Sequence, residues 1–149
     1  VTSAVHFVGP MVYGLVLAGS SFIDAKVIAV IAAFMGWGMA SHAFGAVQDV
    51  RADREAGIKS VATQIGARNT VRFAFALYVV AAAVIMTIGW HGVVASLAVL
   101  PYLVIISPYL NITDADCERA NGGWKRFIWL NFAAGALISL VVINYFQAN

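Results

Sequence analysis

Asp49 and Asp53 are the residues of this sequence whose type and spacing best suit chemistry. They stand one helical turn apart, directly after residues 27–48, which contain no Asp, Glu, Lys or Arg. An ionisable group costs roughly 2.5–3.5 kcal/mol at the centre of an inserted helix. One or two carboxylates, completed by water and phosphate, are how proteins hold Mg²⁺. The pair therefore predicts a Mg²⁺ site at the end of an apolar helix.

Three cations follow the aspartates closely, namely Arg54, Lys59 and Arg68. Arginine and lysine side chains bind phosphate oxygens directly. A metal with nearby cations suits the departure of a diphosphate group, because both neutralise the charge that develops on it. A solvated helix end with ion pairs between neighbouring turns is the alternative interpretation, and the spacing alone leaves it open.

The face of the helix that carries Asp49 contains small residues. At roughly 100° per residue, that face passes through Gly45, His42, Gly38 and Phe34. Small side chains leave room beside the backbone for either a neighbouring helix or a lipid-like substrate. Trp37 is expected to point away from the aspartates, against lipid or another helix.

The composition requires a membrane. Hydrophobic residues make up 62% of the 149 residues and charged residues 11%, which leaves too few polar groups to cover a soluble domain. The net charge of +2 gives no indication of nucleic-acid binding. We predict one all-α membrane domain, with Gly57 ending a helix and a new one starting near Ala67–Thr70. Its five transmembrane helices are expected at about residues 2–23, 27–48, 71–90, 93–110 and 127–145.

The cations indicate an orientation. The loops after the second and fourth helices hold eight of the nine Lys and Arg residues, and the other side has only Lys26. By the positive-inside rule, the aspartate pair faces the cytoplasm. Asp114, Asp116 and Glu118 lie in the later loop on the same side, where we expect a solvated loop near the mouth of the site.

The run QDVRADREAGIKSVAT at residues 48–63, followed by Gly66, resembles the second aspartate-rich motif of the UbiA superfamily of intramembrane prenyltransferases. That pattern, D-x-x-x-D-x-x-x-G-x-x-S/T ahead of a helix, is matched at every position. The resemblance implies a nine-helix bundle in which this chain supplies helices five to nine. It also implies that missing N-terminal helices carry a first motif, N-D-x-x-D-x-x-x-D. Because the chain opens at Val1, we interpret it as a fragment that is inactive alone.

Residues 53–58 and 116–125 are similar to the lycopene elongase branch of that superfamily, which acts in carotenoid and isoprenoid biosynthesis. The resemblance implies Mg²⁺-dependent transfer of a prenyl group from an allylic prenyl diphosphate to a hydrophobic acceptor, such as lycopene, within the cell membrane. An aromatic quinone precursor or another lipid acceptor is an alternative. A non-catalytic membrane module, such as a transporter half or an assembly subunit, is a second.

The same resemblance gives the small-residue face its expected roles. Asp49 and Asp53 bind Mg²⁺, and Phe34, Gly38 and Gly45 line the acceptor cavity, although Gly45 stands where the family often has a tyrosine. His42 is the candidate catalytic base for the final proton loss. A hydrogen bond from His42 to another helix, and ordinary packing of Phe34, are the alternatives.

Overall fold

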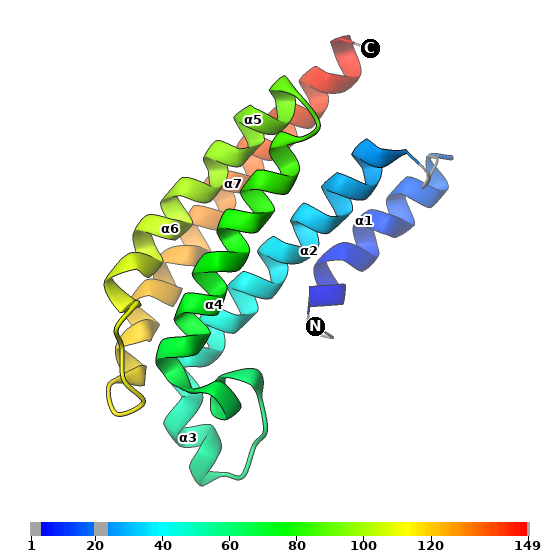
Figure 1. Cartoon of the computed structure of the whole chain (residues 1–149). Helices are drawn as coiled ribbons and strands as arrows, with labels where there is room; N and C mark the ends of the chain where they lie inside the picture. Colours follow the sequence, from blue (N-terminus) through cyan, green and yellow to red (C-terminus); the bar gives the residue numbers. More distant parts are fainter. Residues whose placement is uncertain (1–3, 20–23, 149) are drawn as a thin grey trace.

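The protein folds as a bundle of helices (Figure 1). The computed structural model describes residues 4–19 and 24–148. In chain order, the helices are α1 (Val5–Leu17), α2 (Ala25–Gly45), η2 (Ala46–Asp49), α3 (Val50–Glu55), α4 (Val61–Met86), α5 (Trp90–Ser96), η3 (Leu97–Val99), α6 (Leu100–Ile106), η4 (Ser107–Tyr109), η5 (Cys117–Arg119) and α7 (Ala120–Ala148).

These helices form five rods, because α2 continues through η2 into α3, and α5 continues through η3 into α6 and η4. Three rods are long and apolar enough to cross a membrane, namely Ala25–Glu55, Val61–Met86 and Trp90–Tyr109. A fourth, α7, has 29 residues, whereas α1 has only 13. The predicted all-α membrane bundle is confirmed, and the chain is an integral membrane protein.

The first, third and fifth rods differ from the predicted ranges, and the fifth begins at Ala120 instead of near residue 127. Of the helix expected at 2–23, Val5–Leu17 is helical and the chain turns at Gly19, where φ is 68°; residues 2, 3 and 20–23 lie outside the described part. The helix expected at 71–90 begins ten residues earlier, at Val61. The reason is a capping box in which Ser60 and Thr63 each accept a hydrogen bond from the other's backbone N–H.

A kink at Gly66 divides α4, because this residue has φ 80° and ψ 163° inside the helix. The expected helix start near Ala67 therefore describes the second part of α4. Gly57, with φ 71°, ends α3 as predicted. The backbone N–H of Ile58 then donates to the carbonyl of Asp53 at 2.8 Å, which closes the last turn.

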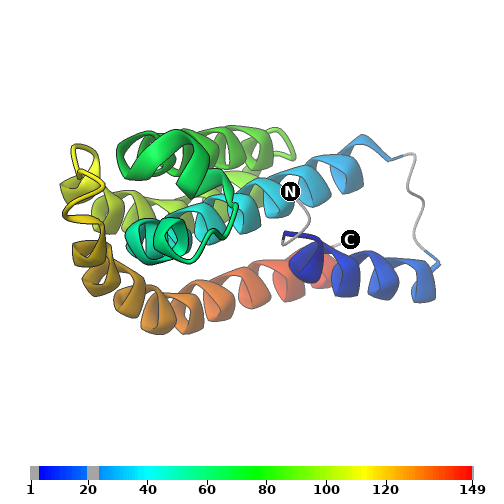
Figure 2. The same cartoon turned by 90° about the horizontal axis from the view of Figure 1, so that it is seen from below.

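Buried aromatic rings hold the rods together. Tyr78 of α4, Tyr102 of α6 and Phe127 of α7 pack around one another, with ring centroids 5.0–6.3 Å apart. The hydroxyl groups of Tyr78 and Ser41 lie 2.7 Å apart, which joins α4 to α2. Figure 2 shows α4 and α7 on opposite sides of α2.

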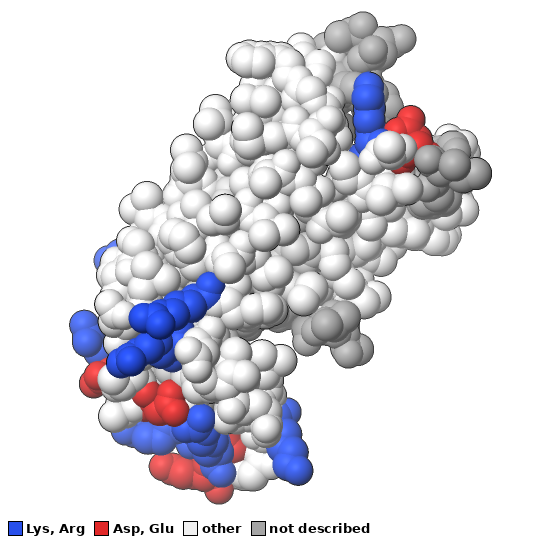
Figure 3. Space-filling model, in the orientation of Figure 1, with Lys and Arg blue, Asp and Glu red and all other residues white. Residues whose placement is uncertain are grey.

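The charged residues gather at the two ends of the molecule. Figure 3 shows most of them around α3 and the neighbouring loops, and a small group at the opposite end, where Asp24 and Lys26 lie. The white surface between them belongs to segments without Asp, Glu, Lys or Arg, such as 27–48 and 73–113. Such an apolar belt is what a bilayer requires of a protein that spans it.

Candidate functional site

The two aspartates lie where the long α2–η2–α3 rod leaves the apolar belt. Asp49 ends η2 and is exposed, whereas Asp53 in α3 is partly buried. The negative charges of the Asp49 and Asp53 carboxylates repel each other. Across the described ranges, no cluster of three or more His, Cys, Asp or Glu side chains is placed to hold a metal ion. A pair of carboxylates still fits Mg²⁺, which commonly keeps water and phosphate in its other positions.

The three cations predicted to bind diphosphate lie in different surroundings. Arg54 donates through Nε to the carbonyl oxygen of Thr63 at 3.0 Å and forms an ion pair with Asp114 through Nη1. Lys59 is exposed in the loop between α3 and α4. Arg68 is exposed on α4 and lines a shallow polar depression of about 400 Å³ together with Asp114. The structure therefore brings Arg54 and Arg68 toward Asp114.

Asp114 connects the loop before α7 to the kink in α4. One of its oxygens accepts a hydrogen bond from the backbone N–H of Ala67 at 2.6 Å, so it caps the helix that restarts after Gly66. A Cβ atom at Gly66 would lie 3.1 Å from this oxygen. The Ala67 N–H holds the pKa of the Asp114 carboxyl below its usual value of 3.8, against an opposing effect of burial, and Arg54 lowers it further.

The loop expected to be merely solvated is therefore engaged with the aspartate segment. Besides the Asp114 contacts, Glu118 forms an ion pair with Arg51. Asp116 fits the expectation better, because its carboxylate accepts a hydrogen bond from Thr113 within the loop. Glu118 is exposed, as a solvated loop predicts, whereas Asp114 is partly buried against α4. The sequence did not show the partners of these two residues, which lie 60 to 67 residues away.

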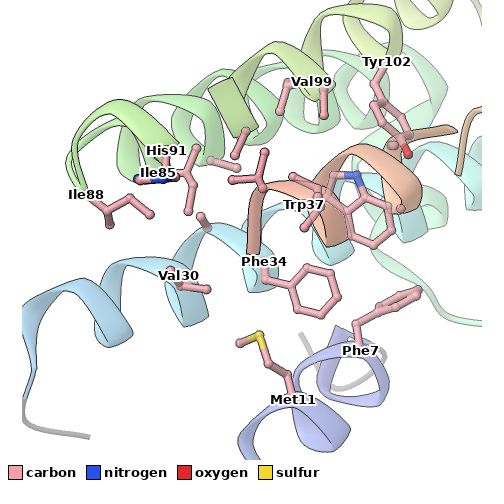
Figure 4. A pocket seen from close by; sticks show the side chains of 18 of the residues that line it. Phe7, Met11, Val30, Phe34, Trp37, Ile85, Ile88, His91, Val99 and Tyr102 are labelled. Carbon is pink, nitrogen blue, oxygen red and sulfur yellow. The ribbon is translucent and has the colours of Figure 1, made fainter. Parts of the chain in front are cut away.

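A large apolar cavity opens among the rods, on the side of Gly38 away from the aspartates. Its volume is about 650 Å³, which is within the usual range for small-molecule sites. Figure 4 shows Phe34 and Trp37 of α2 beside it, with Phe7 and Met11 of α1 nearby. Its remaining walls come mainly from α4, α5 and α7. A long hydrophobic molecule fits such a lining better than a polar one.

Polar groups line one wall of this cavity. The Tyr102 hydroxyl donates to the side-chain oxygen of Asn131 at 2.6 Å, and both residues line the cavity.

Trp37 stacks on Phe34 with ring centroids 5.5 Å apart and planes 8° from parallel. Stacked aromatic rings present electron-rich faces, which stabilise a nearby positive charge.

Of the other predicted residues, Phe34 lines the cavity, whereas His42, Gly38 and Gly45 lie outside its lining. A Cβ atom at Gly38 would lie 3.0 Å from Phe7, and one at Gly45 would lie 3.1 Å from the Trp124 ring. These glycines therefore allow close approach of α1 and α7 to α2. His42 is exposed and packs on Phe7, with ring centroids 5.2 Å apart.

A model of the UbiA prenyltransferase family matches residues 1–133, most of the chain. This chain belongs to the UbiA prenyltransferase family. The match includes the aspartate pair, the kinked α4 and about the first half of α7.

Relatives with curated names match nearly the whole chain. It is 51% identical over 143 residues to the C(50) beta-cyclic carotenoids biosynthesis protein LbtBC of Dietzia sp. (strain CQ4), covering 95% of this chain and 33% of that protein. It is 44% identical over 146 residues to the lycopene elongase/hydratase of Corynebacterium glutamicum, covering 98% and 50%. The lycopene elongase/hydratase of Haloferax volcanii is 33% identical over 123 residues, covering 83% and 38%.

The chain thus spans between a third and a half of the length of these curated relatives. No solved structure matches it. Its resemblance to the lycopene elongase branch of the UbiA superfamily is confirmed by the family and by the names of these relatives.

The sequence interpretation missed Trp37, which was expected to point away from the site. At roughly 100° per residue, Trp37 lies only about 60° around the helix from Phe34, so one cavity can touch both. It also missed Tyr102 and Asn131, which come from two other rods. Asn131, a polar residue in the apolar run after residue 127, was the available signal, because polar groups within a membrane helix usually have a partner.

Proposed function

We propose that this chain is part of an enzyme that transfers a prenyl group from an allylic prenyl diphosphate to a carotenoid such as lycopene. The observation that carries the proposal is that a carboxylate pair, with Asp49 exposed and Asp53 partly buried, and a large apolar cavity lie on the same helical rod. Family membership and the names of the relatives support it. The proposal places the aspartates at the cytoplasmic face of the cell membrane, as the eight cations at that end favour.

Asp49 and Asp53 are the residues that would hold Mg²⁺, and Lys59, exposed on the following loop, is placed to bind diphosphate oxygens. Bound Mg²⁺ would neutralise the charge that develops on the diphosphate as it leaves. A full metal site needs further ligands, which we assign to a first aspartate-rich motif on helices outside this chain. The chain alone is therefore expected to be inactive.

The acceptor would occupy the apolar cavity. Trp37 lies twelve residues before Asp49, which corresponds to roughly 18 Å of helix rise, so a molecule must be long to reach from one to the other. An extended polyene meets this requirement better than a compact quinone ring. The aromatic faces of Phe34 and Trp37 would stabilise positive charge on the polyene.

In the reaction, the bond between the allylic carbon and the diphosphate oxygen breaks, and a double bond of the acceptor captures the resulting carbocation. The acceptor then loses a proton. We propose His42 as the group that takes it, because its imidazole lies on α2 between the level of Asp49 and that of the cavity. The relatives of Corynebacterium glutamicum and Haloferax volcanii are named lycopene elongase/hydratase; in a hydration, water would add to the carbocation, and the proton would then leave from the added water.

Product formation by Asp49→Asn and Asp53→Asn variants of the complete enzyme tests the proposal. Both are expected to insert normally and to lose at least 100-fold in turnover of an allylic diphosphate with lycopene, because each removes a metal ligand. Glu55→Gln is the matched control, since Glu55 is exposed and turned by roughly 160° from Asp53 on the same helix. Turnover near that of the wild type in either Asp variant would instead favour the non-catalytic membrane module.

A further inference from the structure

Three residues of the aspartate-bearing rod are held by one segment far away in the sequence. This segment, residues 111–121, runs from just after η4 through η5 into the first turn of α7, and we call it the brace. The side-chain amide of Asn121 donates to the side-chain oxygen of Gln48. Glu118 pairs with Arg51, and Asp114 pairs with Arg54. Gln48, Arg51 and Arg54 follow each other at intervals of three, so they line one stripe of the rod.

This stripe faces away from the aspartates. Arg51 is two residues from both Asp49 and Asp53, which turns it by roughly 160° from each of them around the helix axis. Contacts on one side of a rod restrict its rotation about its own axis. The brace therefore fixes the direction in which the two carboxylates point.

The brace is itself anchored on both sides. Its Cys117 is fully buried against the rod and donates through Sγ to the carbonyl oxygen of Gln48 at 3.5 Å. At its other end, Arg72 of α4 donates to the carbonyl oxygen of Leu110 at 3.2 Å and to the side-chain oxygen of Asn111 at 3.0 Å. Because the brace is held at both ends, its ion pairs and hydrogen bonds keep the α2–η2–α3 rod in a fixed orientation.

We infer that the brace is a positioning device for the Mg²⁺ ligands, and that Arg51 and Arg54 act through it and not as diphosphate ligands. The inference rests on the proposed function for the role of Asp49 and Asp53. In this inference, the charges of Asp114 and Glu118 orient the carboxylates of Asp49 and Asp53 through the two ion pairs with Arg54 and Arg51. The two arginines are positioning residues.

The double variant Asp114→Asn/Glu118→Gln of the complete enzyme tests the inference, because one exposed ion pair alone contributes little. Two readouts are compared. Amide hydrogen exchange of residues 46–57 is expected to be at least tenfold faster than in the wild type. The Mg²⁺ concentration for half-maximal turnover is expected to rise at least fivefold, with turnover at saturating Mg²⁺ changed less than twofold.

Asp116→Asn is the control, since it removes one carboxylate charge from the same segment but leaves both ion pairs in place. An equal shift in this control, or unchanged exchange in the double variant, would overturn the inference. Glu118→Gln alone provides a milder variant if the double variant folds poorly, and a smaller shift in the same direction is expected.

A charge exchange separates positioning from direct binding. Arg51→Glu and Glu118→Arg are each expected to raise the Mg²⁺ requirement, and the two together are expected to restore it to within twofold of the wild type. Failure to restore it would mean that Arg51 contacts the diphosphate and would overturn the inference. If Asp49→Asn retained turnover, the proposed function would fail, whereas the exchange of residues 46–57 would still report on the brace.

Discussion

Replacing Gly66 by alanine is expected to lower the free energy of unfolding by about 2 kcal/mol. Gly66 has φ 80° and ψ 163°, a region that is essentially restricted to glycine and costs other residues about 1–3 kcal/mol. The new Cβ atom would also lie 3.1 Å from an oxygen of Asp114. That carboxylate is held by Ala67 and Arg54, so it resists moving away.

Reversible unfolding of the complete protein in mixed micelles, followed by tryptophan fluorescence, measures this cost. Gly135→Ala is the control, because a Cβ atom there has no neighbour within 4 Å and Gly135 lies inside α7. This variant is expected to be neutral or more stable by up to about 1 kcal/mol. The cost of Gly66→Ala is also measured in an Asp114→Ala background. The part of the cost that remains there is due to backbone strain, because the contact between the new Cβ atom and the Asp114 carboxylate is gone. A change below about 0.5 kcal/mol for Gly66→Ala would refute the reasoning.

Four further predictions concern the site and its supports. In the complete enzyme, His42→Asn is expected to lower turnover by about 100-fold or more, and an unchanged rate would leave His42 only its packing contact with Phe7. Ala134→Phe fills part of the cavity and is expected to raise the KM for lycopene at least about tenfold while the Mg²⁺ requirement stays constant; kinetics in liposomes check both. Gly92→Ala places a Cβ atom 1.9 Å from the carbonyl oxygen of Ile85, so unfolding should show a loss above about 3 kcal/mol. The lowered pKa of Asp114 means that its ionised form stabilises the fold fully above its unfolded pKa, near 3.8, and that this contribution is lost as the pH falls through its lower folded pKa; the stability difference between wild type and Asp114→Ala should therefore be larger at pH 7 than at pH 2.

The rods and the end of α3 were predictable because their signals are local. Charge-free runs mark the segments that suit a bilayer. Gly57 supplies the left-handed turn that ends α3. The early start of α4 was also readable, since Ser60 and Thr63 have the spacing of a capping box, but the apolar run that begins later outweighed it.

The brace and the cavity were not predictable, because they depend on contacts between distant parts of the chain. The ion pair of Arg54 joins it to Asp114, 60 residues later, and no local pattern indicates that contact. A helix buried in lipid is apolar on all sides, so periodicity does not show which face a cavity uses. For this reason Gly38 and Gly45 were expected to line the cavity together with Phe34, whereas Phe34 and Trp37 line it.

Mg²⁺-dependent binding of an unreactive allylic diphosphate analogue tests the central claim most directly. In the complete protein, the account predicts that the analogue binds only with Mg²⁺, and that Asp49→Asn and Asp53→Asn each weaken its binding at least 100-fold while Glu55→Gln does not. Binding that is independent of Mg²⁺, or equal in all three variants, would contradict the assignment of Asp49 and Asp53.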